Sequence, residues 1–111
     1  MGFLIVSSIF LLISLVFKFF PPKRINRIYG WRTKFAMKNQ ETWDEAQRYG
    51  ANLLVIFGLI SVIIGWIVSV TVQNENIQGY LTLAWVILIC LVILMGELHL
   101  RKVFDKDGNR K

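Results

Sequence analysis

The sequence predicts an all-α integral membrane protein with three transmembrane helices and a short amphipathic interfacial helix in the loop between the first two. Three observations support this fold class. Of the 111 residues, 55% are hydrophobic, the apolar residues fall into three long blocks, and basic residues are confined to particular connections. A chain of this length has room for one domain, residues 1–111, and its apolar content exceeds that of ordinary soluble domains.

The three apolar blocks have the length of membrane-spanning helices. They cover residues 2–20, 51–72 and 77–98, and Lys18 is the only charge in the first. At 1.5 Å per residue each extends roughly 30 Å, which matches the hydrocarbon core of a bilayer. Because lipid cannot hydrogen-bond to an exposed backbone, and three segments cannot close a β-barrel, we expect helices.

The basic residues predict the orientation of the chain. Residues 21–50 carry seven Lys and Arg, residues 73–79 carry none, and five more follow residue 100. By the positive-inside rule, we expect the 21–50 loop and the C-terminus in the cytoplasm and the N-terminus outside. The net charge of +6 is then explained by topology and by anionic lipids of the bilayer, not by nucleic acid.

The 21–50 loop is long for a connection in so small a protein. Its second half, residues 39–49, has a helical pattern in which Asn39 is a good N-cap, acidic residues come early and Arg48 comes late. We therefore expect a short interfacial helix there, with the Trp43 side facing lipid or protein. The charged tail, residues 105–111, is expected to fray.

The loop also carries side chains that a simple topology signal does not need. Gly30 can adopt a positive φ, and Arg32 can donate a bidentate pair of hydrogen bonds to a carboxylate or phosphate. An equally weighted alternative is a structural role, in which the loop folds back and closes the helix mouths. The candidate residues for ligand or partner binding are Asn26, Tyr29, Gly30, Trp31, Arg32, Thr33, Asn39, Thr42 and Trp43.

Small residues form one stripe along the second apolar block. Their spacings of three and four place them on one helix face, where a neighbouring backbone can approach closely. We expect this stripe to serve helix packing, and because three spans enclose little volume we also expect a homo-oligomer or an assembly with a larger partner. The stripe consists of Gly58, Ser61, Gly65 and Ser69.

The sequence offers little for catalysis or metal binding. Glu97 precedes Arg101 by four residues, a favourable order for a helical ion pair, and His99 lies on a different helix face from Glu97. The chain has one histidine and one cysteine, Cys90, so we expect no metal site, no cofactor and no ordinary enzyme activity. Whether Glu97 and His99 have a functional role is left open.

Two spaced elements carry a family resemblance. Ile25–Thr33 reads INRIYGWRT and Met37–Trp43 reads MKNQETW, followed by Ala46 and Tyr49. Together they resemble the SdpI family of bacterial membrane proteins, in its short three-helix form. The resemblance implies a location in the bacterial plasma membrane and a role like that of SdpI-type immunity proteins, which protect the producing cell against a secreted membrane-active peptide toxin. It also implies signalling through a cytoplasmic regulator.

Three functions are therefore considered. The leading one is a non-enzymatic membrane immunity and signalling protein that meets a peptide toxin. The alternative is a small membrane enzyme or transporter component, in which the 21–50 loop forms a lipid-facing polar pocket and Arg32 holds a headgroup phosphate. The third is an accessory scaffold that assembles through the stripe of small residues.

Overall fold

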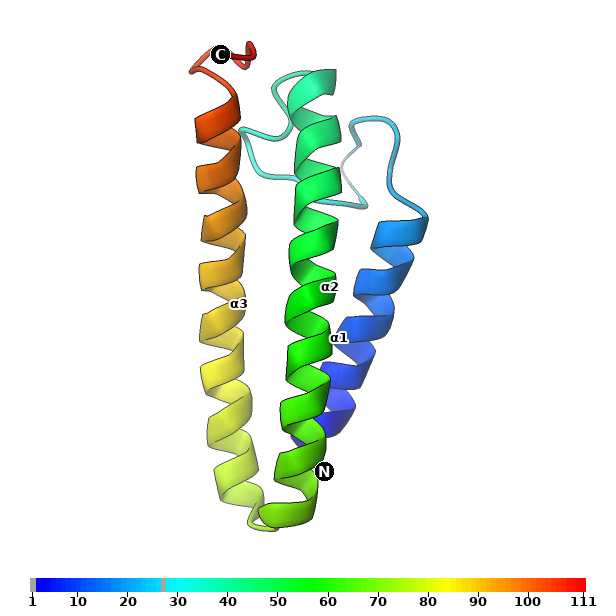
Figure 1. Ribbon diagram of the computed structural model, residues 1–111, viewed down its shortest axis with the longest axis vertical. Helices are drawn as coiled ribbons and strands as arrows, with labels where there is room; N and C mark the ends of the chain where they lie inside the picture. Colours follow the sequence, from blue (N-terminus) through cyan, green and yellow to red (C-terminus); the bar gives the residue numbers. More distant parts are fainter. Residues whose placement is uncertain (1, 27) are drawn as a thin grey trace.

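Three helices make up the computed structural model, which describes residues 2–26 and 28–111 (Figure 1). They are α1 (Gly2–Phe19), α2 (Gln40–Thr71) and α3 (Glu75–Val103). Each is long enough and apolar enough to cross a membrane, so the predicted three-span, all-α class is confirmed. Arg27, which belongs to the first sequence element of the loop, lies outside the described residues.

The predicted separate interfacial helix is wrong, because its residues form the first turns of α2. Asn39 is the N-cap as predicted: its Oδ1 accepts from the Thr42 backbone N–H at 2.9 Å, and the Thr42 Oγ1 accepts from the Asn39 N–H at 3.0 Å. Gly50 does not end the helix, since a glycine within a helix costs only about 1 kcal/mol and no proline follows it. With 32 residues, α2 is roughly 48 Å long and exceeds the hydrocarbon thickness.

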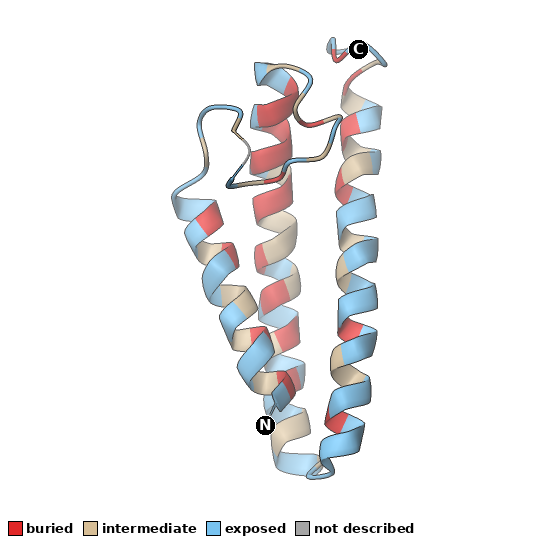
Figure 2. Cartoon of the chain, turned by 180° about the vertical axis from the view of Figure 1, so that it is seen from behind, coloured by how far each residue is buried: buried red, intermediate tan, exposed pale blue. Residues whose placement is uncertain are grey.

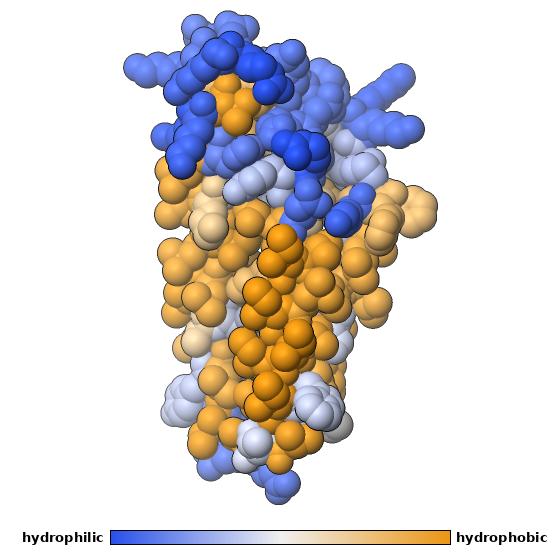
Figure 3. All heavy atoms as spheres, viewed as in Figure 1, coloured by the Kyte–Doolittle hydropathy of each residue, from blue (hydrophilic) through white to orange (hydrophobic). Residues whose placement is uncertain are grey.

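The surface shows where lipid surrounds the bundle. The molecule measures 50 × 24 × 20 Å, and an apolar belt covers its middle, with hydrophilic side chains gathered at the end that carries the loop and the C-terminus (Figure 3). Large apolar side chains on all three helices point outward, among them Leu12, Ile63 and Leu83, which are at least 60% exposed. Such a surface is stable in lipid and not in water, so the chain is a multi-pass membrane protein.

α1 packs along α2 through the small-residue stripe. A Cβ added to Gly58 would lie 3.2 Å from the Leu11 Cα, and one added to Gly65 would lie 3.1 Å from the Leu4 Cα. These distances show that the two backbones are in close contact at both glycines. Ser61 faces α3 instead, where its Oγ accepts a hydrogen bond from the Trp85 Nε1 at 2.9 Å.

Ser69 is hydrogen-bonded within its own helix: its hydroxyl donates to the Trp66 carbonyl at 2.7 Å. The part of the stripe from Gly58 to Gly65 is therefore occupied by neighbouring helices of the same chain. The positions from Gly58 to Gly65 are therefore not available for the scaffold interface with another protein that the sequence analysis considered.

The end of the bundle opposite the loop is closed by Gln78. This side chain is buried, its Oε1 accepts from the Phe3 backbone N–H at 3.1 Å, and its Nε2 donates to the Val72 carbonyl at 3.0 Å. The Phe3 and Trp85 rings meet edge to face with centroids 5.9 Å apart. From this point α1 leans away from α3 toward the loop end (Figure 1).

The tail after α3 folds back onto the loop end, so the predicted fraying is wrong. Phe104 is only 1% exposed, and the Asn39 Nδ2 donates to the Gly108 carbonyl at 2.8 Å. Gly108 has a φ of +83°, which glycine adopts readily. The tail is thereby attached to the N-cap of α2.

Replacing Gly65 with leucine should loosen α1 from α2. The new side chain would meet the α1 backbone near Leu4, so the helices must separate, at a cost of about 1–3 kcal/mol as for other overpacked sites. Unfolding in detergent, followed by circular dichroism, measures the loss. Gly79→Leu is the matched control, since nothing lies within 4 Å of a Cβ at that position. Equal stability of the two variants would contradict the predicted packing.

Candidate functional site

The loop between α1 and α2 is shaped first by its own backbone turns. α1 ends at Phe19 because the prolines that follow cannot continue a helix. The Asn26 Oδ1 then accepts from the backbone N–H groups of Ile28, at 2.9 Å, and Tyr29, at 2.7 Å. The Tyr29 hydroxyl donates to the Phe20 carbonyl at 2.9 Å. Asn26 and Tyr29 therefore build the turn that returns the chain toward the bundle.

Gly30 lies in a narrow space between Pro22 of the loop and Gln47 of α2. Its φ is +107°, a value that side chains other than glycine rarely tolerate. A Cβ there would lie 2.5 Å from the Pro22 Cγ and 2.7 Å from the Gln47 Oε1. Both conformation and space therefore require glycine, as its position in the motif suggested.

Trp31 inserts its indole between α2 and α3. It is 7% exposed, and a Cβ added to either Gly50 of α2 or Gly96 of α3 would lie 2.5 Å from an atom of the ring. Gln47 holds the backbone of this residue from both sides: its Oε1 accepts from the Trp31 N–H at 2.7 Å and its Nε2 donates to the Trp31 carbonyl at 2.8 Å. The loop is thus fixed to α2.

Glu97 attaches the same loop to α3. Its Oε1 accepts a short hydrogen bond from the Thr33 Oγ1 and a longer one, 3.5 Å, from the Trp31 Nε1. The expected ion pair with Arg101 is not among the ion pairs of the described residues. The half-buried Glu97 carboxylate therefore points toward the donors of the loop and not along the surface of α3 toward Arg101.

The second sequence element joins the loop to the start of α2. Trp43 has no exposed surface, and its Nε1 donates to the Pro22 carbonyl at 2.8 Å. The Thr42 Oγ1 also donates to the Ala36 carbonyl at 3.0 Å. Together with the Asn39 cap, these contacts account for the tryptophan, threonine and asparagine of this element. They hold the loop in place.

A polar cluster that sequence reasoning missed lies beside the loop. Both oxygens of Glu45 are engaged, Oε1 by Arg48 at 2.7 Å and Oε2 by the His99 Nε2 at 2.8 Å. The His99 ring stacks on Tyr49 with centroids 3.6 Å apart. The spacing of Glu45 and Arg48 was a visible signal, but His99 approaches from α3. Within residues 2–26 and 28–111, no group of three or more His, Cys, Asp or Glu could hold a metal ion.

A cavity of about 540 Å³ opens beneath the loop, and all three helices line it. Its walls are apolar, and the loop forms its roof with Arg32 and Thr33 as the polar members. Five candidates from the sequence therefore meet at one place, whereas Asn26, Asn39, Thr42 and Trp43 do not line it. The lining residues are Phe10, Ile13, Phe17, Ile28, Tyr29, Gly30, Trp31, Arg32, Thr33, Leu54, Ile89 and Ile93.

The polarity of the surfaces around the cavity indicates what it can hold. The outward surface of the helices is apolar and exposed, whereas the loop end is hydrophilic (Figure 3). Buried residues are concentrated along α2, and α1 and α3 are exposed on much of their surface (Figure 2). The arrangement suits an amphipathic guest with an apolar part between the helices and a polar part at the loop.

Replacing Gln47 with leucine should release the loop. The substitution leaves the Trp31 N–H and carbonyl without their partner, at a cost of about 1–3 kcal/mol, so the loop should open roughly tenfold more often. The rate of trypsin cleavage after Lys23 to Lys38, followed by mass spectrometry in detergent, measures the opening. Gln73→Leu in the opposite connection is the control. Equal protection of both variants would show that Gln47 does not hold the loop.

Comparison with known proteins adds a family match. The model of the SdpI/YfhL protein family matches residues 23–97, from the loop to Glu97. The chain is 40% identical over 57 residues to YfhL of Bacillus subtilis (strain 168), a protein described as uncharacterized, and the match covers 51% of this chain and 52% of the relative. The chain thus spans about half the length of that relative in the match. No solved structure matches the chain significantly.

Proposed function

Because this chain belongs to the SdpI/YfhL protein family, we propose that it is a non-enzymatic membrane immunity protein that protects a bacterial cell against a membrane-active peptide toxin. In this proposal the loop and the C-terminus face the cytoplasm and the N-terminus faces outward. The observation that carries the proposal is the cavity beneath the loop, which six residues of the first sequence element help to line.

The use of the polar side chains favours binding over catalysis. Gln47 is engaged by the backbone of Trp31, and Glu97 accepts from Trp31 and Thr33. These groups maintain the roof of the cavity, and its walls are apolar. An apolar space under a polar roof matches an amphipathic peptide, whose apolar face enters the bundle while its polar face stays at the boundary.

The membrane setting decides which contacts would give selectivity. A toxin already dissolved in lipid gains little from apolar burial alone, since lipid tails are as apolar as the cavity walls. Close packing and hydrogen bonds at the roof must then distinguish the toxin from lipid. Arg32, Thr33 and Tyr29 lie at that level. Exposed cations of the loop, such as Lys34, would meet a cytoplasmic regulator.

A survival experiment tests the proposal. Cells lacking the gene should be more sensitive to a membrane-active peptide than intact cells, and the wild-type gene should restore survival. Ile93→Trp should fail to restore it, because the larger side chain fills the cavity, and Arg32→Ala should restore it only in part. Survival is measured across a panel of amphipathic peptides, with protein levels checked by immunoblot.

The matched control is Ile87→Trp, because Ile87 lies on the same helix and is exposed like Ile93 but does not line the cavity. Equal survival of deleted and intact cells across the panel would exclude immunity, and full protection by Ile93→Trp would exclude the cavity. A lipid that co-purifies with wild-type protein but not with Arg32→Ala, without any change in survival, would instead favour the membrane enzyme or transporter alternative.

A further inference from the structure

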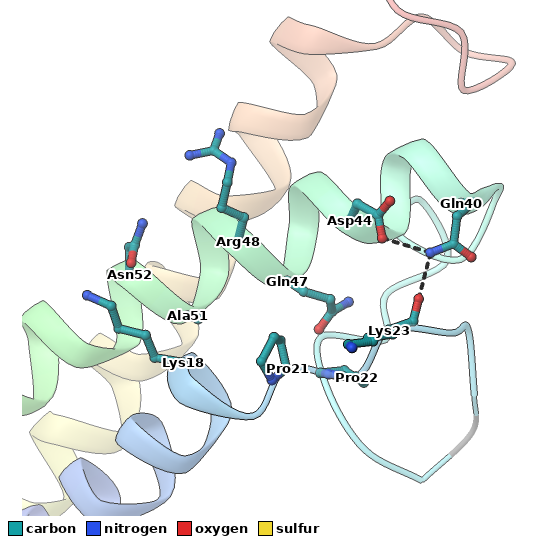
Figure 4. A pocket seen from close by; sticks show the side chains of 10 residues that line it. All are labelled: Lys18, Pro21, Pro22, Lys23, Gln40, Asp44, Gln47, Arg48, Ala51 and Asn52. Carbon is teal, nitrogen blue, oxygen red and sulfur yellow. Dashed lines mark hydrogen bonds between the residues drawn. The ribbon is translucent and has the colours of Figure 1, made fainter.

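A second cleft, of about 550 Å³, lies where α1 leaves the bundle and α2 begins. The last turn of α1 and the two prolines after it form one side, and the first turns of α2 form the other (Figure 4). None of its charged residues belongs to the cavity beneath the loop. It is therefore a separate site, and what it binds does not depend on the proposed function.

Three cations line this cleft: Lys18 from the end of α1, Lys23 from the start of the loop and Arg48 from α2. Asn52 follows Arg48 by one helical turn, so both occupy the same face of α2, and the Lys18 side chain extends toward this face (Figure 4). Lys18 and Lys23 take part in no ion pair among the described residues. Both ammonium groups are exposed and can reach a ligand.

Carboxylates partly balance this charge. Arg48 is paired with Glu45, and Asp44 lines the cleft, where its Oδ1 accepts from the Gln40 Nε2 at 2.7 Å (Figure 4). Three cations against two carboxylates leave one net positive charge. This value matches a single phosphodiester monoanion and is small for a polyanion such as a nucleic acid.

The depth of the cleft identifies the source of the phosphate. Lys18 lies in the last turn of an apolar helix, a position from which a lysine reaches the headgroup layer. Pro21, Pro22 and Ala51 supply apolar surface beside the cations. A lipid headgroup presents its phosphate at this depth together with an apolar glycerol ester region. A free phosphate has no apolar part that could pack against the two prolines and Ala51.

We propose that this cleft binds the headgroup of an anionic phospholipid. Lys18 and Lys23 supply the positive charge that holds the phosphate, Asn52 and Arg48 donate to headgroup oxygens, and the two prolines and Ala51 pack against the glycerol region. A lipid held in this way bridges the end of α1 and the start of α2. Basic pockets between transmembrane helices bind anionic lipids by the same chemistry.

Lipid retention measures the site directly. The full chain is reconstituted in nanodiscs of equal phosphatidylglycerol and phosphatidylcholine and released for native mass spectrometry. Wild-type protein should retain phosphatidylglycerol about tenfold over phosphatidylcholine, and the Lys18→Gln, Lys23→Gln double variant should fall to twofold or less. Lys18→Arg with Lys23→Arg should restore retention, because charge and donors are kept.

Lys102→Gln with Lys106→Gln is the matched control, since it removes two exposed cations at the same end of the bundle but outside the cleft. Circular dichroism confirms that each variant is equally helical. An equal loss of phosphatidylglycerol in this control would overturn the proposal in favour of a general charge effect. Displacement of the lipid by an equal concentration of inorganic phosphate would overturn the assignment to a lipid.

Discussion

The insertion of the Trp31 indole between α2 and α3 is the contact on which the loop end of this protein depends. It requires a glycine on each helix, Gly50 and Gly96, because any side chain there would meet the ring. It also requires Gln47 to satisfy the Trp31 backbone, since a buried backbone group without a partner costs about 1–3 kcal/mol. One aromatic residue of a loop thereby sets the distance between two helices.

The rest of the loop end follows from this insertion. With Trp31 in place, Thr33 reaches Glu97 of α3, and the chain can continue to the Asn39 cap, where α2 begins and the tail attaches. Because α2 starts well before its membrane-spanning part, its first turns present Trp43 and Gln47 to the loop. In a separate interfacial helix, these side chains would not belong to the same continuous helix as the second span.

The two hollow regions arise from the way α1 packs. Gly58 and Gly65 hold α1 against α2 over the part nearer the opposite end, while α1 leans away from α3 toward the loop (Figure 1). The space between α1 and α3 becomes the apolar cavity, with the loop as its roof. On the other side of the α1 exit, the prolines and the first turns of α2 enclose the basic cleft. The cavity beneath the loop suits the proposed amphipathic guest, and the basic cleft suits the proposed anionic headgroup.

The sequence by itself determined the three spans, the loop and the Asn39 cap, and it indicated that Gly30 can adopt a positive φ, because hydrophobic length, capping and backbone preference are local properties of the chain. Only the tertiary structure decided that α2 is continuous through Gly50, that Glu97 faces the loop and not Arg101, and that the first sequence element lies over a cavity. The residues on either side of Gly50 and Gly96 in the sequence do not indicate the role of these two glycines. Their role depends on Trp31, and the contact between residues so distant in sequence exists only once the helices are packed.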